Sequence, residues 1–193
     1  MIEKKELRKQ ILVKRDALTC EEHKEKSHVI AQNVIQHPVF KEADTLLLYA
    51  SFRSEVDTTE LFQAAKSLGK KIYYPKVLGA EMEFYRVETE DDFENGCWGI
   101  LEPKPVEDRR YVAEKEEKVC IIMPGAVFDA NGNRIGYGRG YYDKFLEEIQ
   151  SFHVCKVGIG FECQRISIDE FPVEEHDIGL DILITENNVY IME

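Results

Sequence analysis

The first third of the chain alternates long amphipathic stretches with short apolar runs. Residues 3–18 have high helix propensity, and at about 100° per residue three basic side chains share one helix face with three apolar ones. That face consists of Lys4, Leu7, Arg8, Ile11, Arg15 and Leu18. Two interpretations stay open: the basic side chains snorkel at the edge of a core, or the helix carries cations to a buried anion.

A second helix is predicted from the capping-box pattern at residues 19–22 to about Gln36, where His37-Pro38 stops it. We interpret His23, His28 and His37 as surface residues of this helix, because no metal-ligand spacing joins them to a partner. A third helix is expected to begin at the capping pattern of residues 57–60 and to continue to Leu68, with Gly69 closing it.

Short, largely apolar runs bounded by turn residues predict buried strands at residues 45–49, 71–75, 119–123, 154–159 and 180–185. Residues 82–87 alternate like an edge strand, residues 88–118 are acidic and irregular, and residues 189–192 can form a terminal hairpin with the preceding strand. The alternation of strands and helices predicts an α/β fold. We expect a single three-layer domain over residues 1–193, with a central mostly parallel sheet, helices on both faces and a C-terminal hairpin.

Composition narrows the function classes. The 193 residues are 44% hydrophobic and 32% charged, as is usual for a globular protein, and they contain neither an apolar run of 18 residues nor a signal peptide. The net charge of −12 argues against nucleic-acid and membrane partners. Five cysteines without a Cys-x-x-Cys pair indicate neither a disulfide framework nor a zinc site, so we expect a cytoplasmic protein.

The most informative stretch follows the predicted strand 119–123. Pro124-Gly125 ends that strand, residues 129–133 supply turn chemistry, and Gly136, Gly138 and Gly140 alternate with larger residues before a helix predicted over residues 141–150. Glycines allow backbone N–H groups to approach an anion, and a helix N-terminus carries about half a positive charge. This order of strand, glycine-rich loop and helix start is typical of a phosphate site.

Charged residues accompany the glycines. Arg134 and Arg139 offer guanidinium groups suited to phosphate oxygens, and Asp143 places a carboxylate where a Mg²⁺ ion that bridges phosphates would need one. The glycine spacing alone is weak evidence, since many such loops merely turn. The loop lacks the Gly-Lys-Ser/Thr of a Walker loop, and Tyr141 replaces the last glycine of a dinucleotide fingerprint. A phosphate site and a simple turn both remain open on these residues alone.

The complete string resembles the signature of the 5-formyltetrahydrofolate cyclo-ligase family, also called 5,10-methenyltetrahydrofolate synthetases. The matching residues are Pro124, Gly125, Phe128, Asp129, Gly132, Arg134, Gly136, Gly138, Gly140, Tyr141, Tyr142, Asp143 and Leu146. Further matching places lie in order between residues 4 and 185, so the resemblance covers nearly the whole chain.

The resemblance implies an ATP site and two groups close to the reaction. The implied ATP-binding residues are Lys4, Arg8, Arg134, Ile135, Gly136, Tyr137, Gly138, Arg139, Gly140, Tyr141 and Tyr142. Of these, Arg139 and Tyr142 are implied to be catalytic, with Tyr142 at the junction of the two substrates.

The folate and metal sites are implied in the same way. Glu55, in a Glu-x-Asp-Thr context, is implied to bind the pterin ring, and the other implied substrate-binding residues are Ala50, Trp98 and Tyr142. A carboxylate suits the amino group and ring N–H of a pterin through paired hydrogen bonds. Asp143 and Asp177 are implied Mg²⁺ contacts, with Asp181 as the alternative to Asp177.

The expected function is therefore the ATP- and Mg²⁺-dependent conversion of 5-formyltetrahydrofolate to 5,10-methenyltetrahydrofolate, with release of ADP and phosphate. Folate and ATP are the expected small-molecule partners, and a monomer is expected. Two alternatives stay open: a divergent ATP-dependent kinase or ligase that acts on another small heterocyclic acid, and a non-catalytic folate- or nucleotide-binding module.

Overall fold

The structure is a computed structural model that describes residues 3–96, 99–167, 171–172 and 177–192. Its main sheet has seven strands in the order β11-β10-β9-β6-β1-β2-β3. The five inner strands pair in parallel, and the two edge strands, β3 and β11, pair antiparallel with their neighbours. The predictions of a mostly parallel sheet and of a C-terminal hairpin are confirmed. The strands are β1 (Thr45–Leu47), β2 (Lys71–Leu78), β3 (Glu81–Arg86), β6 (Val119–Met123), β9 (Val154–Ile159), β10 (Ile182–Ile184) and β11 (Val189–Ile191).

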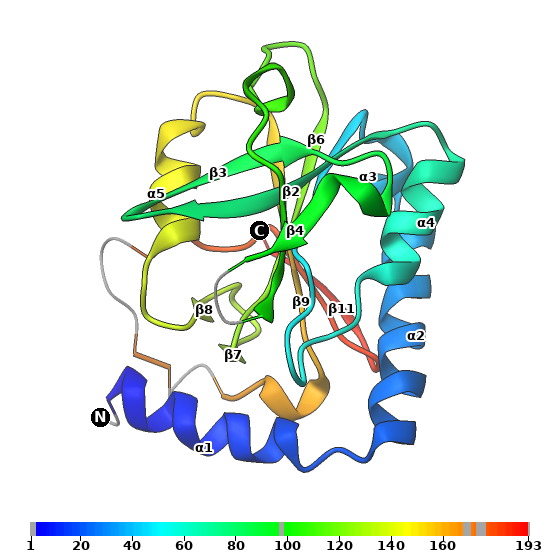
Figure 1. Cartoon of the computed structure of the whole chain (residues 1–193). Helices are drawn as coiled ribbons and strands as arrows, with labels where there is room; N and C mark the ends of the chain where they lie inside the picture. The colour runs from blue at the N-terminus through cyan, green and yellow to red at the C-terminus, as the bar shows by residue number, and fades with distance from the viewer. Residues whose placement is uncertain (1–2, 97–98, 168–170, 173–176, 193) are drawn as a thin grey trace.

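Helices cover both faces of this sheet, as the sequence predicted (Figure 1). The helices on one face are α2 (Cys20–Gln36), α3 (Pro38–Glu42) and α4 (Thr59–Ser67), and the other face carries α5 (Tyr141–Glu148). Alternate strand residues face opposite layers: Leu46 packs in the core beneath α2 and α4, whereas Leu47 packs beneath α5. Among the described residues, no helix is both long and apolar enough to cross a bilayer.

The N-terminal helix α1 (Lys4–Asp16) lies across one end of the sheet (Figure 1). Its buried residues are Leu7, Ile11 and Arg15, and its apolar side chains pack in a third core cluster with Ala126 and Ile135. The predicted face on which cations accompany apolar residues is therefore present.

Several sequence predictions are corrected in detail. Pro38 occupies the first turn of the short helix α3 rather than only ending α2, because a proline fits a position whose N–H needs no partner. Residues 88–118 are not wholly irregular. They contain the hairpin strands β4 (Phe93–Asn95) and β5 (Leu101–Pro103) and the 3-10 helices η1 (Glu90–Asp92) and η3 (Glu107–Arg109).

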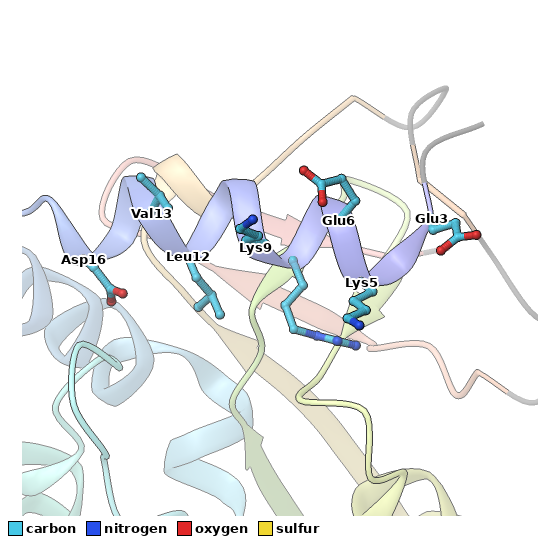
Figure 2. A pocket seen from close by; sticks show the side chains of 8 residues that line it. Glu3, Lys5, Glu6, Lys9, Leu12, Val13 and Asp16 are labelled. Atoms are coloured by element: carbon cyan, nitrogen blue, oxygen red, sulfur yellow. The ribbon is translucent and has the colours of Figure 1, made fainter.

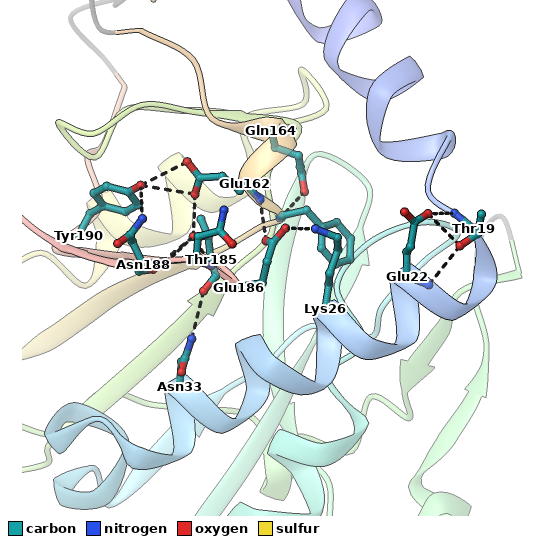
Figure 3. A network of polar contacts seen from close by, with 12 residues as sticks. Thr19, Glu22, Lys26, Asn33, Glu162, Gln164, Thr185, Glu186, Asn188 and Tyr190 are labelled. Atoms are coloured by element: carbon teal, nitrogen blue, oxygen red, sulfur yellow. Dashed lines mark hydrogen bonds and ion pairs between the residues drawn. The ribbon is translucent and has the colours of Figure 1, made fainter.

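A polar network fixes α2 to the C-terminal hairpin (Figure 3). Lys26 of α2 forms an ion pair with Glu186 at 2.5 Å, and Glu186 accepts a hydrogen bond from the backbone of Glu162 at 2.7 Å. Glu162 is the first residue of the 3-10 helix η4 (Glu162–Gln164), and its carboxylate accepts a hydrogen bond from the hydroxyl of Tyr190 at 3.3 Å. The predicted capping box of α2 is confirmed, since Thr19 and Glu22 satisfy each other's backbone N–H groups.

Candidate functional site

The candidate site lies where the inner strands end at their carboxyl termini. In open α/β sheets this edge holds ligands, because the loops that follow neighbouring parallel strands converge there. Here the segment after β1 contributes residues 49–56, the segment after β6 leads to the glycine-rich residues, and α1 packs beside both. We call this region the carboxyl-edge site, and we call residues 136–140 the glycine loop.

A small hairpin presents the glycine loop. Strands β7 (Val127–Phe128) and β8 (Arg134–Ile135) pair antiparallel, and the buried carboxylate of Asp129 accepts hydrogen bonds from two backbone N–H groups of the intervening turn, 2.8 and 2.9 Å away. After β8, Gly138 has a φ of +87° and Gly140, the N-cap of α5, a φ of +66°. These left-handed conformations explain why glycines occupy both positions.

Arg134 and Asp143 meet at the base of the loop. Arg134 is 8% exposed, and its Nη2 lies 3.2 Å from Oδ1 of Asp143. The guanidinium also lies 5.5 Å from the ring centre of Tyr142 and donates to the carbonyl of Pro124 at 3.3 Å. Its Nε atom is buried and has no hydrogen-bond partner in the described part of the chain. Arg134 thus retains a donor for a further acceptor.

Two basic residues of α1 reach the same region. Nε of Arg8 donates a hydrogen bond of 2.7 Å to the carbonyl oxygen of Gly136, and a Cβ built on Gly138 would lie 3.4 Å from Nη2 of Arg8. One helical turn earlier, Nζ of Lys4 pairs with the carboxylate of Asp177 at 2.6 Å. The implied phosphate ligands and one implied metal ligand therefore come together from segments far apart in the sequence.

Glu55 lies in a buried polar cluster next to the glycine loop. Its carboxylate accepts the hydroxyl of Tyr137 at 2.7 Å and the backbone N–H of Phe52 at 2.9 Å, and the residue is 7% exposed. Burial raises the pKa of Glu55, while the two hydrogen bonds and the charge of Arg15 act in the opposite direction. Arg15 reaches the cluster by donating to the Tyr137 hydroxyl at 3.0 Å.

Comparison with known proteins identifies the family. The model of the 5-formyltetrahydrofolate cyclo-ligase family matches residues 1–186 of the chain. The chain belongs to this family. A probable 5-formyltetrahydrofolate cyclo-ligase of Schizosaccharomyces pombe is 33% identical over 171 residues, which cover 83% of each chain. The 5-formyltetrahydrofolate cyclo-ligase of Escherichia coli is 30% identical over 180 residues, 92% of this chain and 97% of that protein.

A solved structure agrees with the fold as well. The NMR structure of the Aquifex aeolicus 5,10-methenyltetrahydrofolate synthetase matches with a TM-score of 0.83 and 36% sequence identity, over 98% of this chain and 93% of the other. This cyclo-ligase family member is therefore an enzyme, a ligase of folate-dependent one-carbon metabolism. The resemblance seen in the sequence is confirmed.

The structure separates the two alternatives for the second acidic residue. Asp177 lies beside Lys4 in the carboxyl-edge site. Asp181 directly precedes β10, so it lies at the opposite, amino edge of the sheet, where it accepts from the backbone and side chain of Lys156 at 2.7 and 2.9 Å. This position at the amino edge favours Asp177 over Asp181 as the predicted second metal contact.

Asp143 and Asp177 carry the oxygen donors that Mg²⁺ prefers. No group of three possible His, Cys, Asp or Glu ligands gathers in the part of the chain that the structure describes. Mg²⁺ needs only one or two carboxylates when substrate phosphates and water complete its octahedron. Asp143 and Asp177 are such hard oxygen donors, and each is already matched with a cation, Arg134 and Lys4 respectively.

The other predicted site residues lie at different depths. Arg139 and Tyr137 belong to the exposed part of the glycine loop, and Tyr141 donates its hydroxyl to the carbonyl of Gly79 at 3.3 Å. Tyr142 packs its ring against Phe84, and burial raises its pKa, so its phenol stays protonated. Ala50 is half-buried, directly after the buried Tyr49, whereas the prediction for Trp98 lies outside the described residues.

Sequence reasoning missed two contributors. The helix pattern predicts Arg15 on the inward face of α1 but gives it no role in the site. A charged residue in a partly apolar stripe is the signal that could have indicated one. His23, interpreted as a surface residue, is half-buried instead: its Nε2 lies 2.8 Å from the carbonyl oxygen of Glu55, and its ring meets Phe161 edge to face. A groove along α1 shares only Arg8 with the residues assigned above, and most of its other lining side chains are exposed residues of the same helix (Figure 2).

Proposed function

We propose that the carboxyl-edge site carries out the cyclo-ligase reaction by transferring the γ-phosphoryl group of ATP to the formyl oxygen of 5-formyltetrahydrofolate. A formamide is a weak electrophile whose oxygen leaves poorly, and phosphorylation corrects both defects. The neighbouring secondary amine then attacks the formyl carbon and loses its proton, the carbon–oxygen bond breaks, and phosphate departs. The products are 5,10-methenyltetrahydrofolate, ADP and phosphate.

The observation that carries this proposal is the junction between α1 and the glycine loop. In a chain with a net charge of −12, Arg8 contacts the glycine loop, Arg134 lies at its base, and Lys4 lies one helical turn from Arg8. Two of the loop glycines, Gly138 and Gly140, adopt left-handed conformations. A local cationic cluster against an acidic background is expected where an anionic ligand binds. The Nη atoms of Arg8 and the Nε of Arg134 can donate to phosphate oxygens, and the loop amides supply further donors.

Phosphoryl transfer needs alignment and charge neutralisation more than covalent help from the protein. We assign the triphosphate to Lys4, Arg8, Arg134 and the glycine loop. Exposed Arg139 would supply a further cation to the transferred group. Asp143 and Asp177 would hold Mg²⁺, which when bound neutralises phosphate charge and orients the γ-phosphoryl group.

The folate would bind beside this loop. Glu55 would accept hydrogen bonds from the amino group and ring N–H of the pterin, with Ala50 and Trp98 as the other predicted contacts. Tyr142 would lie between the ATP and folate sites. Its ring lies against the guanidinium of Arg134, and the charge of Glu55 contributes to raising its pKa. We further propose that residues 1–193 act as one domain, as a monomer, in the cytoplasm.

An isotope experiment tests the route. 5-Formyltetrahydrofolate labelled with ¹⁸O in the formyl group is converted with unlabelled ATP, and the released phosphate is analysed by mass spectrometry. Transfer to the formyl oxygen predicts that the label ends in phosphate. Label found in water instead would contradict the phosphorylated intermediate. Absence of methenyl product in the absorbance assay when ATP is omitted is the accompanying control.

A further inference from the structure

The buried cluster around Glu55 contains a chain of hydrogen bonds that the phosphoryl-transfer scheme does not use. Arg15, only 3% exposed, donates from Nε to the hydroxyl of Ser54 and from Nη1 to the hydroxyl of Tyr137, each at 3.0 Å. The Tyr137 hydroxyl lies 2.7 Å from Oε1 of Glu55. A buried arginine on α1 is thus linked through the glycine loop to the predicted pterin ligand.

The direction of each hydrogen bond in this chain is determined. A guanidinium can only donate, so the Tyr137 hydroxyl must accept from Arg15. Its single proton is then directed to Glu55. The other carboxylate oxygen accepts the backbone N–H of Phe52. Because an ionised carboxylate has about four lone-pair positions, about two remain for a ligand after these inner bonds are made.

We propose that Arg15 and Tyr137 are positioning residues for folate binding, which hold the carboxylate of Glu55 ionised and oriented with its remaining lone pairs toward the pterin. The inference rests on the proposed role of Glu55 in folate binding. It gives Tyr137 a function through its side chain, in addition to the backbone contact with ATP that its place in the glycine loop implies.

The surroundings of Glu55 explain why such support is needed. Besides Arg15 and Tyr137, the phenols of Tyr49 and Tyr142 lie close enough for the charge of Glu55 to act on their pKa, while the ring of His23 contacts its backbone carbonyl. Burial raises the pKa of both phenols, so they stay neutral. Arg15 is therefore the cation that opposes the burial of the Glu55 charge within this described group.

The chain also connects the folate and ATP halves of the proposed site. Arg8 and Arg15 lie on the same face of α1 and contact consecutive residues of the glycine loop, Gly136 and Tyr137. The loop is thus attached to one rigid helix at two points. The contacts of α1 that hold the glycine loop therefore also fix the Tyr137 hydroxyl, which donates to Glu55.

Tyr137→Phe tests the inference, because it removes the hydroxyl and keeps a ring that is 48% exposed in the wild type. Folate and ATP dissociation constants are measured separately by calorimetry over a range of pH. Folate affinity should fall about tenfold at neutral pH, the effect of one hydrogen bond to a charged group, while ATP affinity changes much less. The acid limb of folate binding should move to higher pH, since Tyr137 no longer lowers the pKa of Glu55.

Tyr190→Phe is the matched control, since that hydroxyl also contacts a glutamate, Glu162, and neither residue is assigned to the folate or ATP site (Figure 3). It should leave folate affinity and its pH profile unchanged. Arg15→Lys, checked for folding by its melting temperature, should weaken folate binding in the wild type but add little in the Tyr137→Phe background.

Glu55→Gln separates failure of the inference from failure of the proposed function. If Glu55→Gln binds folate as tightly as the wild type, both the role of Glu55 and the positioning chain are overturned. If Glu55→Gln weakens folate binding but Tyr137→Phe changes neither affinity nor pH profile, only the positioning chain is overturned. The inference further expects Tyr137→Phe to have little effect in the Glu55→Gln background, and an equal loss in both backgrounds would contradict it.

Discussion

The Nε atom of Arg8 donates a 2.7 Å hydrogen bond to the carbonyl oxygen of Gly136, across 128 positions of sequence. The bond attaches the N-terminal helix to the glycine loop through Nε, and within the described residues both Nη atoms stay available for other acceptors. Within the first helix, Lys4 lies one turn earlier and pairs with Asp177. Two cations one helical turn apart therefore lie at this junction, one bonded to the glycine loop and the other paired with a carboxylate.

The first prediction concerns these cations. Arg8→Gln should reduce ATP affinity about tenfold or more, since it removes a charge-assisted contact from a partly buried site. Folate affinity and melting temperature should change little. ATP binding by calorimetry at low and high ionic strength measures the effect, and the difference between wild type and variant should shrink as salt screens the contact.

Lys9→Gln supplies the control, because Lys9 lies on the same helix with its side chain exposed on the outer surface (Figure 2). It removes the same charge and should leave ATP affinity unchanged, since exposed charges contribute only about 0–1 kcal/mol. Equal ATP affinity in the wild type and in the folded double variant Lys4→Gln, Arg8→Gln would exclude α1 from the ATP site.

The second prediction concerns the metal. Asp143→Asn should raise the Mg²⁺ concentration needed for half-maximal turnover, because a neutral amide is a poorer ligand than a carboxylate for a hard cation. Folate affinity should be affected far less. Turnover measured over a Mg²⁺ titration gives the result, and unchanged activity at limiting Mg²⁺ would overturn the assignment of Asp143.

Asp177→Asn should show the same dependence, and Asp181→Asn should not. Asp181 contacts Lys156 at the opposite edge of the sheet, so its substitution controls for the loss of one acidic charge. A shifted Mg²⁺ requirement in Asp181→Asn would show that charge alone, rather than coordination, produces the effect in the other two variants.

Elements set by local pattern were predictable from the sequence. The basic stripe of α1 places Arg8 and Arg15 on the inward face because side chains seven residues apart lie on one side of a helix. The capping box at Thr19 and the glycine loop with its helix start were equally local. Each depends on chemistry within a few residues, which a sequence shows directly.

Contacts set by tertiary structure were not predictable in this way. Nothing local to Tyr137 indicates that its hydroxyl reaches Glu55, 82 positions away, or that Arg15 directs its proton. Asp177 and Asp181 were equivalent as carboxylates until the direction of β10 placed them at opposite edges of the sheet. The short helix α3 was missed because Pro38 signals a helix stop and a helix start equally well.

The third prediction concerns stability and pH. Burial, the largest effect, raises the pKa of Glu55 above its ordinary value of 4.5. Below that value the carboxyl group is protonated in both folded and unfolded chains. As pH rises, the unfolded chain releases the proton first, so ionisation progressively destabilises the folded wild type until pH exceeds the raised pKa. Glu55→Gln has no such dependence, so its melting temperature relative to the wild type should rise between about pH 4 and pH 7.

Thermal unfolding of both proteins in the same buffers measures this difference. The two proteins differ at one side chain only. The pH-dependent contributions of the other titrating groups therefore largely cancel in the difference between the melting temperatures. A difference that is constant with pH, or that falls as pH rises, would contradict a raised pKa for Glu55.

The last prediction uses the backbone of the glycine loop. Gly138 has a φ of +87°, and an added Cβ would lie 3.4 Å from the guanidinium of Arg8. Gly138→Ala should therefore lower the melting temperature through left-handed strain of about 1–2 kcal/mol. It should also weaken ATP binding, since the added methyl group would contact the Arg8 guanidinium and occupy space beside it. Gly69→Ala is the matched control: its φ is +70°, and an added Cβ meets no atom within 4 Å among the described residues. Both variants should lose similar stability, but only Gly138→Ala should lose ATP affinity. A comparable loss in both would show that general strain, rather than local geometry at Arg8, governs ATP binding.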